Sequence, residues 1–444
     1  MKLIDSIIST LGFQSLNLMQ ESMLTCKAKN RMLLAPTGAG KTLAYLLPCV
    51  ERFSAAQKGV EIIIISPSRE LALQIDQVFR TMKTNEAITC VYGGHSQRVE
   101  KRSLEYTPRV VVGTPGRLLD HLDKGSIDGN FTTHLIFDEF DKLLEMGFDN
   151  EMGDIVSKLP NIEYCTLTSA TPTLDYPDYI DLERFEKLDF LTGTTSGQLE
   201  IKKIHCTKEE RKEKVVDILR LTGDEQVVIF CNFREQAQEV SDYLFDLDIE
   251  SEFFHGGMEQ HDRERALSIF KNKSSNILVS TDLAARGLDI SSIKHVIHFE
   301  LPNDINAFTH RNGRTARVAE SGTAYVLITD QVLNKIDNGK AWKYDYVADI
   351  PGEFINLETS TKAIPLPRWI TVYFGKGKKD KLSKIDIVGF LCQKGGLAKE
   401  DIGMIELKDF YAYAAINRSK SKETMERIKG LKIKNKTTKI YLEY

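Results

Sequence analysis

Short runs of β-branched and other apolar residues alternate with longer amphipathic segments along most of this 444-residue chain. Segments with helical periodicity, such as 70–82 and 214–221, lie between the runs. This alternation is the sequence form of repeated βα units, and it predicts an α/β fold with parallel sheets. The apolar runs occupy residues 62–65, 110–112, 135–137, 227–230, 277–279, 296–299 and 324–328.

The runs divide into two sets, and residues 191–197 (LTGTTSG) between them are typical of a linker. A second boundary is expected where the pattern breaks and prolines cluster, in residues 351–367. The chain is long enough for several domains. We therefore expect a first domain over 1–195, a second over 196–350, a linker over 351–366 and a tail domain over 367–444.

Composition excludes several classes of protein. With 42% hydrophobic and 27% charged residues, the chain resembles a globular protein rather than a disordered or fibrous one. No stretch approaches the roughly 18 apolar residues needed to cross a membrane, and the first ten residues are too interrupted for a secretory signal. The seven cysteines include no C-x-x-C pair, which suggests neither a zinc site nor a disulfide framework. We expect a cytoplasmic protein with no membrane partner.

The net charge of −4 conceals an asymmetry along the chain. Residues 366–444 carry 18 lysines and arginines against 9 acidic residues, a net charge of +9. The preceding residues carry 41 basic and 54 acidic side chains, a net charge of −13. A basic tail on an acidic body indicates a polyanionic partner, although a lysine-rich surface that is merely solvated remains the alternative.

The segment 35–42, APTGAGKT, follows a short apolar run and leads into residues with helical spacing. A strand, a loop of small residues and a helix in this order wrap backbone N–H groups around a triphosphate. Gly38 and Gly40 let the backbone approach the phosphates, Lys41 offers a charge, and Thr42 can hold Mg²⁺. A chance GKT in a loop remains the alternative for this segment alone.

An acidic pair, Asp138 and Glu139, follows the apolar run 135–137. Such a pair suits a Mg²⁺ site, in which one carboxylate orients the metal's water shell and its neighbour positions the attacking water. The alternative is that Asp138 caps a helix. Residues 169–171 follow a further apolar run, and ligands bind beyond the carboxyl ends of parallel strands.

The second half of the chain contributes residues 310–317, HRNGRTAR. Arg314 and Arg317 are three residues apart, so both side chains lie on one helical face and can reach a phosphoryl group. An arginine finger of this kind contributes about 10³–10⁵ in rate. A solvated basic face is the alternative for an isolated pair.

In their order along the chain, these segments resemble the DEAD-box proteins, which are ATP-dependent RNA helicases, over approximately residues 1–345. The resemblance implies two tandem RecA-like parallel-sheet domains, with the ATP-binding domain over 1–195 and the helicase C-terminal domain over 196–350. The matching segments are 35–42 (APTGAGKT), 67–72 (PSRELA), 93–94 (GG), 114–117 (TPGR), 138–141 (DEFD), 169–171 (SAT), 229–232 (IFCN), Gln260 with Arg263, 280–289 (STDLAARGLD) and 310–317 (HRNGRTAR).

The resemblance implies an RNA-stimulated ATP hydrolase with ATP and Mg²⁺ as cofactors. Its catalytic residues would be Glu139, which positions the hydrolytic water, Lys41, and the arginine fingers Arg314 and Arg317. Thr42 and Asp138 would hold Mg²⁺, partly through water. The residues implied for ATP binding, with Gln20 reading adenine, are Phe13, Gln20, Ala35, Pro36, Thr37, Gly38, Ala39, Gly40, Lys41, Thr42, Asp138, Gly287 and Asp289.

Because the resemblance divides the site between two domains, closure is required, and an RNA that bridges both domains can drive it. Ser169 and Thr171 would couple hydrolysis to strand separation through Asp141 and His310. Contacts to the RNA backbone would make the grip tolerant of sequence. The residues implied for those contacts are Arg69, Gly94, Thr114, Arg117, Arg263, Thr281 and Asp282.

Several residues depart from the family's pattern. Phe140 replaces the usual alanine; activity is expected to survive if the ring finds room behind the loop, although its bulk would weaken coupling through Asp141. Leu16 and Asn17 replace Pro-Thr, which predicts a relaxed preference for adenine. Asn312 stands where an apolar residue is usual. The stretch after the SAT segment is shorter and more acidic than in relatives.

The tail domain has its own pattern. Strands are expected over 369–374, 410–417 and 439–444, and helices over 384–396 and 421–429, in a βαββαβ-like order typical of a small α+β, RRM-like domain. Residues 408–413 are loosely similar to the RNP1 aromatic pattern. Period-two alternation places Tyr411 and Tyr413 on one face, where core packing and base stacking both remain open.

The tail also resembles the RNA-binding domain of the DbpA subgroup. This resemblance implies structured RNA as the partner, specifically large-subunit ribosomal RNA and pre-ribosomal particles, and a role in ribosome assembly. The end of the chain departs from it, with Lys-Thr-Thr-Lys at 436–439 and an acidic Glu443 in place of an arginine-rich strand. The candidates for phosphate contact are Lys376, Lys378, Lys379, Lys381, Arg418 and Lys434.

The leading hypothesis is therefore an ATP-dependent RNA helicase that hydrolyses ATP on binding RNA and locally unwinds short duplexes. An ATP-gated RNA clamp or scaffold with weak turnover is the alternative prompted by Phe140 and Asn312. A DNA helicase is a third hypothesis, which the SAT and DEFD segments and the RRM-like tail disfavour.

Overall fold

The computed structural model describes residues 2–36, 38–53, 59–171, 176–191, 199–282, 293–302, 305–315, 321–337, 350–357, 361–434 and 437–443. Four predicted site residues, Thr37, Gly287, Asp289 and Arg317, lie outside these ranges. The chain forms two compact units, one built mainly from the first 196 residues and the other from most of the remainder. Among the described residues, no helix combines the length and the apolar character that a membrane span requires.

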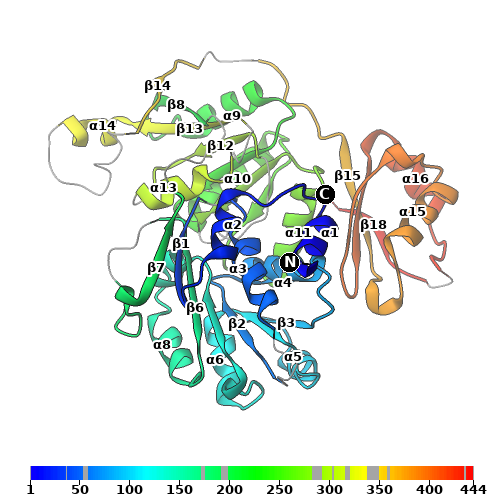
Figure 1. Ribbon diagram of the computed structural model, residues 1–444. Helices are drawn as coiled ribbons and strands as arrows, with labels where there is room; N and C mark the ends of the chain where they lie inside the picture. The colour runs from blue at the N-terminus through cyan, green and yellow to red at the C-terminus, as the bar shows by residue number, and fades with distance from the viewer. Residues whose placement is uncertain are drawn as a thin grey trace. The chain divides into compact units, whose positions relative to one another are not determined.

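The first unit is built on a seven-stranded sheet with the order β3-β4-β2-β5-β6-β1-β7 (Figure 1). Every pair of neighbouring strands in this sheet is parallel. All carboxyl ends therefore lie at one edge of the sheet. The strands are β1 (Asn30–Leu34), β2 (Ile62–Ile65), β3 (Ile88–Val91), β4 (Val110–Gly113), β5 (His134–Phe137), β6 (Tyr164–Ser169) and β7 (Phe185–Asp189).

Both faces of this sheet are covered by helices. Strand β2 consists of four consecutive buried isoleucines, of which Ile62 and Ile64 join the apolar cluster of helices α1–α4, whereas Ile63 and Ile65 join that of α5–α8. An unbroken apolar run is what a parallel strand between two helical layers requires. The helices are α1 (Lys2–Leu11), α2 (Leu18–Thr25), α3 (Lys41–Glu51), α4 (Arg69–Thr81), α5 (Gln97–Leu104), α6 (Pro115–Asp123), α7 (Phe140–Glu145) and α8 (Asp149–Ser157).

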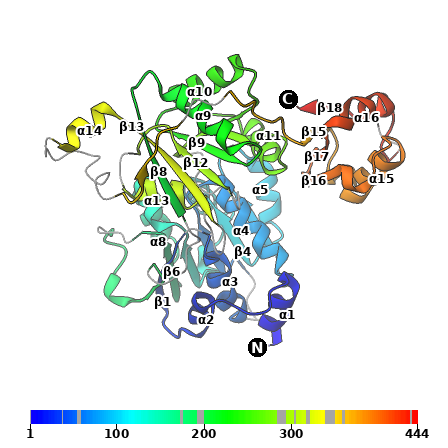
Figure 2. The ribbon, with the colours of Figure 1, turned by 90° about the horizontal axis from the view of Figure 1, so that it is seen from above.

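The second unit contains another seven-stranded sheet, with the order β10-β11-β9-β12-β13-β8-β14. Its paired strands are also parallel. Helices α9 (Arg211–Thr222) and α10 (Arg234–Asp246) lie together on one side of this sheet, away from α13 (Ile305–Asn312) (Figure 2). Val215 of α9 and Val240 of α10 belong to one apolar cluster, and Phe308 of α13 belongs to a separate cluster with Val326. The strands are β8 (Leu199–Cys206), β9 (Val227–Cys231), β10 (Glu252–Phe254), β11 (Ile277–Thr281), β12 (His295–His298), β13 (Gly322–Thr329) and β14 (Glu353–Phe354).

The helices of this second sheet confirm the predicted periodicity. Helix α9 covers the predicted segment 214–221, as α4 covers most of 70–82 in the first unit. The predicted fold class, two RecA-like parallel sheets followed by a small α+β domain, is confirmed. The helices are α9 (Arg211–Thr222), α10 (Arg234–Asp246), α11 (Gln260–Lys271), α13 (Ile305–Asn312) and α14 (Asp330–Asp337).

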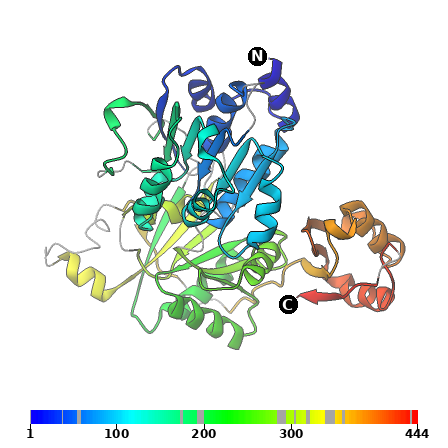
Figure 3. The ribbon, with the colours of Figure 1, turned by 90° about the horizontal axis from the view of Figure 1, so that it is seen from below.

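The tail, orange to red in Figure 3, is a small four-stranded antiparallel sheet with the order β16-β17-β15-β18 and two helices. The expected βαββαβ order is present. One of its strands, β16, had not been placed by the sequence prediction; its six residues, IGMIEL, follow a short 3₁₀ turn. The elements are β15 (Trp369–Phe374), α15 (Lys384–Gln393), β16 (Ile402–Leu407), β17 (Ala412–Asn417), α16 (Ser421–Ile428) and β18 (Ile440–Glu443).

Candidate nucleotide and RNA sites

The strand order of the first sheet sorts the predicted site residues into two groups. Strands β5, β6 and β1 are neighbours, and the segments that follow them are 138–141, 170–171 and 35–42, the predicted nucleotide site. Strands β3, β4 and β2 lie side by side in the other half, and they are followed by the predicted RNA-contacting segments. Because the sheet is parallel, both groups lie at its carboxyl edge, as expected for ligands of such sheets.

The loop after β1 has the backbone of a phosphate site. Gly38 and Gly40 have φ values of 83° and 90°, a region that favours glycine, and Gly40 directly precedes Lys41, the first residue of α3. The Lys41 Nζ atom donates to the carbonyl oxygens of Ala35 at 2.7 Å and Pro36 at 3.3 Å. The loop thus brings a buried ammonium group and a helix N-terminus together, which fits a triphosphate.

Gln20, the predicted adenine-reading residue, contacts this loop. Its backbone N–H and side-chain oxygen form a reciprocal capping box with Asn17, and its Nε2 atom donates to the Gly40 carbonyl at 3.4 Å. Asn17 also donates through Nδ2 to the Ala39 carbonyl at 3.1 Å. The departure at position 17 therefore supplies a helix cap and a second hydrogen bond to the loop. Phe13 is 53% exposed.

The acidic segment after β5 is held by a residue that the sequence prediction missed. Thr168 donates through Oγ1 to Asp138 Oδ1 at 2.6 Å, and it accepts the backbone N–H of Glu139 at 3.1 Å. Burial, followed by the neighbouring charge of Glu139, raises the pKa of Asp138 to about 6. The only signal for Thr168 was its place immediately before the SAT segment.

Glu139 has a left-handed backbone, with φ 50° and ψ 56°, and its side chain is almost completely buried. Non-glycine residues rarely adopt this conformation, which costs of the order of 1–3 kcal/mol and clusters at functional sites. The backbone hydrogen bond to Thr168 helps to hold the residue there. The strain supports a functional rather than a structural role for Glu139.

The predicted coupling residues of the first unit are brought together. Thr171 donates through Oγ1 to Asp141 Oδ2 at 2.7 Å, and Ser169 donates to the Thr171 carbonyl at 2.5 Å while accepting its N–H at 3.2 Å. Buried hydrogen bonds therefore connect the end of β6 to the start of α7, so a movement of either segment would displace the other.

Phe140 finds room behind the acidic segment. The side chain is 1% exposed, and its ring lies 5.6 Å from that of Phe137, edge-on, and 5.8 Å from that of Tyr176, stacked. Both distances suit favourable aromatic pairs. The ring belongs to the apolar core, and the neighbouring carboxylates Asp138 and Asp141 both make their hydrogen bonds.

In the second unit, Arg311 makes hydrogen bonds to three different residues, although the sequence prediction gave it no role. Its side chain is 1% exposed and pairs with both carboxylate oxygens of Asp282, at 2.5 and 2.7 Å. It also donates to the Glu300 carbonyl at 2.6 Å and to Asn232 Oδ1 at 2.7 Å. Asp282, a predicted RNA contact, is therefore oriented by Arg311, whose only signal was its place within HRNGRTAR.

The polar residue at position 312 has a polar partner. Asn312 Oδ1 lies 2.9 Å from His298 Nε2 in the core, and the His298 ring stacks on Phe308 at 4.5 Å. Burial, and then the charge of Arg311, lower the pKa of His298 to about 3, so the ring is neutral and donates through Nε2. The departure at 312 is thus compensated within the domain.

Replacing Asn312 by leucine is expected to lower the free energy of unfolding by about 1–3 kcal/mol, because the His298 N–H would be left buried without an acceptor. Chemical denaturation of the full chain measures the change. Adding His298→Phe is expected to recover most of the loss, because no polar group then remains unpaired. Equal stability of the wild type and Asn312→Leu would show that the pair contributes nothing.

Further predicted residues of the second unit are also buried. Arg263 lies on α11 with its guanidinium 5.2 Å from the centre of the Phe254 ring, and Thr281 ends β11. His310 and Arg314 are 7% and 5% exposed. A solvated basic face, the alternative reading of HRNGRTAR, does not describe Arg314.

The tyrosines of the tail lie on one face, as predicted, and that face contacts α11 of the same unit. Tyr411 and Tyr413 approach to 5.4 Å between ring centres, and Tyr413 is completely buried. The Tyr411 hydroxyl donates to Glu264 at 2.5 Å, and Arg265 pairs with Glu443 at 2.8 Å. The structure thus favours packing over an open stacking surface for these rings.

The basic candidates of the tail differ in their surroundings. Arg418 is held by a two-pronged ion pair with Glu250, at 2.9 and 2.8 Å, and by the Pro367 carbonyl. Lys376 pairs with Asp380 and Lys434 with Asp386. Three other candidates are exposed, namely Lys378, Lys381 and Lys379, of which Lys379 lies 3.5 Å from Asp409.

Comparisons with known proteins agree with these sites. The chain matches the DEAD/DEAH box helicase model over residues 17–179, the helicase conserved C-terminal domain over 182–319 and the DbpA RNA binding domain over 371–442. It is 30% identical to the ATP-dependent RNA helicase DbpA of Escherichia coli, covering 98% of this chain and 96% of that protein. It is 29% identical to DbpA of Bacillus subtilis, covering 97% and 95%.

Among solved structures, the chain is similar to the DEAD-box helicase Mss116 bound to single-stranded RNA and UDP-BeF, with a TM-score of 0.66 and 26% identity over 77% of this chain and 76% of that one. The matched models cover both RecA-like sheets and the tail, in the order in which the site residues occur. The chain belongs to the DEAD-box family of ATP-dependent RNA helicases, and its tail identifies it as one of the DbpA type.

Proposed function

We propose that this helicase binds structured ribosomal RNA of the large subunit through its tail and locally unwinds short duplexes during ribosome assembly. The observation that carries the proposal is the DbpA-type RNA-binding domain behind two RecA-like sheets. Residues 1–195 and 196–350 would be the two helicase domains, 351–366 the linker and 367–444 the targeting domain. Pre-ribosomal particles in the cytoplasm would be its place of action.

The nucleotide chemistry would use hard oxygen ligands, which Mg²⁺ prefers. Thr42 and Asp138 would hold the ion beside the ATP phosphates, and bound Mg²⁺ would neutralise the charge that develops on them. Lys41 would leave its loop carbonyls for the phosphates, and Glu139 would orient the attacking water. Arg314, with Arg317, would stabilise the transferring phosphoryl group.

RNA binding by the first unit would use the carboxyl ends of β2, β3 and β4. Gly94 has a φ of 86°, a backbone conformation that favours glycine, and an added Cβ atom there would lie 2.8 Å from an Arg69 guanidinium nitrogen, which would have to move. Arg69, Gly94, Thr114 and Arg117 would contact the phosphate backbone, which carries no sequence information. Specificity would therefore have to come from the tail.

Within the tail, exposed lysines 378, 379 and 381 would contribute phosphate contacts, because the tyrosine face packs on α11. Arg418 is already paired with Glu250 and would contribute less. These three lysines belong to the segment 366–444, whose net charge is +9, whereas the rest of the chain has a net charge of −13. Counterion release on phosphate neutralisation would make this binding depend on salt.

The test is RNA-dependent phosphate release by the full chain, stimulated by fragments of large-subunit ribosomal RNA or by unrelated structured RNA of equal length. We expect half-maximal stimulation at a lower concentration of the ribosomal fragments. A variant with glutamine at 378, 379 and 381 is expected to lose this preference while keeping generic stimulation. No RNA-dependent turnover would refute the helicase activity, and equal stimulation by both RNAs would refute the ribosomal target.

The clamp hypothesis rested on Phe140 and Asn312, and both side chains are accommodated without disturbing the described site. Strand displacement measured on a short RNA duplex separates the two functions: a clamp would bind RNA in an ATP-dependent manner without releasing a strand. The same duplex made with deoxyribose tests the DNA hypothesis, for which we expect no unwinding.

A further inference from the structure

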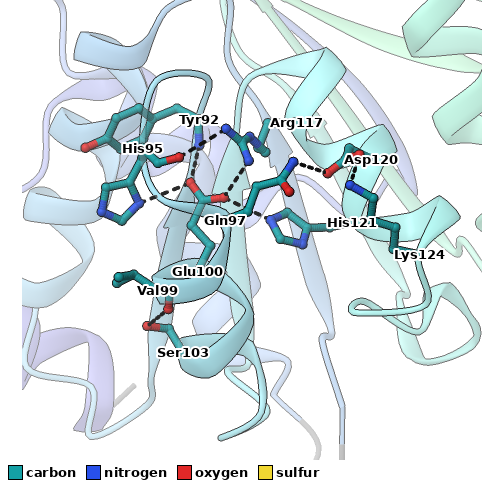
Figure 4. Close-up of polar contacts among 10 residues, drawn as sticks. All are labelled: Tyr92, His95, Gln97, Val99, Glu100, Ser103, Arg117, Asp120, His121 and Lys124. Atoms are coloured by element: carbon teal, nitrogen blue, oxygen red, sulfur yellow. Dashed lines mark hydrogen bonds and ion pairs between the residues drawn. The ribbon is translucent and has the colours of Figure 1, made fainter.

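A buried carboxylate that the nucleotide chemistry does not use lies at the centre of the RNA-side segments of the first unit. Glu100, on α5, has no exposed side-chain surface. Its Oε1 atom accepts the Tyr92 N–H at 3.0 Å and faces His95 Nδ1 at 3.2 Å, while Oε2 faces His121 Nε2 at 3.0 Å (Figure 4). Burial disfavours the charge, but these hydrogen bonds outweigh it and lower the pKa of Glu100 to about 2.

The same carboxylate holds Arg117. Arg117 Nη1 lies 3.4 Å from Glu100 Oε2, and Nη2 donates to the His95 carbonyl at 3.2 Å. The two terminal nitrogens of the guanidinium therefore face two different anchors, which fixes the plane of the group. The Arg117 side chain is 11% exposed, so most of it is held within the domain.

The anchors belong to separate predicted RNA-contacting segments. Tyr92 and His95 flank the paired glycines after β3, whereas Arg117 and His121 lie on α6, which begins directly after Thr114. A second hydrogen bond also joins α5 to α6: Gln97 Nε2 donates to Asp120 Oδ2 at 3.0 Å. One ionised carboxylate thus fastens the glycine turn to the Arg117 helix, as Figure 4 shows.

We infer that Glu100 is a positioning residue for RNA, which sets the glycine turn and the Arg117 guanidinium at the spacing that a phosphate backbone requires. The inference rests on the proposed RNA contact of Arg117. Glu100 itself would touch no RNA, because its carboxylate is covered by the four groups that it binds. It acts by holding in advance a geometry that RNA would otherwise have to impose.

Glu100→Gln is the informative variant, because it keeps the shape of the side chain. The glutamine oxygen can still accept the Tyr92 N–H, and its NH₂ group can donate to His121 after a tautomer change. The glutamine side chain carries no charge, so the substitution removes the ion pair with the Arg117 guanidinium selectively. The matched control is Glu61→Gln, which removes a buried carboxylate 3.3 Å from Arg109 at the start of β2, the opposite end of the sheet.

We expect Glu100→Gln in the full chain to raise the RNA concentration for half-maximal ATPase stimulation about tenfold, the size expected for one charge-assisted contact. ATP binding and the maximal rate at saturating RNA are expected to stay within about twofold. Glu61→Gln is expected to leave the RNA concentration dependence unchanged. Arg117→Gln is expected to weaken RNA binding by itself, and adding Glu100→Gln to it is expected to have no further effect.

The outcomes distinguish the proposed RNA contact of Arg117 from the positioning role of Glu100. If Arg117→Gln leaves RNA dependence unchanged, the proposed contact of Arg117 fails, and the inference fails with it. If Arg117→Gln weakens RNA binding but Glu100→Gln does not, or the two effects add, only the inference is overturned. A parallel loss of ATP binding and of the melting temperature in Glu100→Gln would also overturn it, because that pattern marks a structural carboxylate.

Discussion

Glu139→Gln is expected to lower RNA-stimulated ATP hydrolysis by about 10²–10⁴ while leaving ATP and RNA binding intact. An amide cannot take a proton from the attacking water, but it has the same shape as the carboxylate. The backbone of residue 139 is held independently of its side chain, through the N–H donated to Thr168 at 3.1 Å. Phosphate release at saturating RNA, together with nucleotide and RNA binding isotherms, measures the effect.

The control for this variant is Glu163→Gln, a carboxylate of the same unit that is more than half exposed. It is expected to hydrolyse ATP at the wild-type rate. Retention of more than a tenth of the wild-type rate by Glu139→Gln would assign the water-positioning role to another residue. Loss of ATP binding would instead indicate that the strained backbone had relaxed.

Phe140→Ala, which restores the residue usual in the family, is expected to cost about 3–5 kcal/mol of folding free energy. The ring is buried between Phe137 and Tyr176, so its removal leaves a cavity that the parallel sheet cannot close. Urea denaturation of the full chain measures this loss of folding free energy. The transition of the first unit is identified as the one that moves to higher urea when ATP is added, because ATP stabilises the unit that binds it.

Activity per folded molecule is expected to survive in Phe140→Ala, because Thr168 and Thr171 hold the flanking carboxylates. Phe245→Ala, at a ring that is 80% exposed in the second unit, is the control and is expected to change stability by less than about 0.5 kcal/mol. A loss below about 1 kcal/mol for Phe140→Ala would show that the core repacks around alanine.

The sequence predicted the elements whose signal is local. Strand β2 is four isoleucines, and the loop before α3 combines two glycines with a lysine, so both were recognisable without knowing their neighbours. Strands β7 and β16 were not predicted, because three of the five residues of the first are charged and the second contains a glycine and a glutamate. Edge strands of this kind are buried on one face only, and no continuous apolar run marks them.

The residues of the candidate site also fall into those with a local sequence signal and those without one. The residues that would touch ligand follow motif spacing, but those that hold them depend on contacts between distant segments. Glu100 meets His121 across 21 positions, and Arg311 meets Asn232 across 79. Whether Tyr413 packs or stacks was likewise undecidable from the tail alone, because one of its neighbours, Arg265, belongs to α11.

The His298–Asn312 pair has a consequence for how this chain can drift in evolution. Each side chain alone would be a liability in the core, since either one left without the other buries an unpaired polar group. A lineage that has acquired both cannot return to two apolar residues through single neutral steps. Related sequences that descend from this chain are therefore expected to keep both residues or to replace both together.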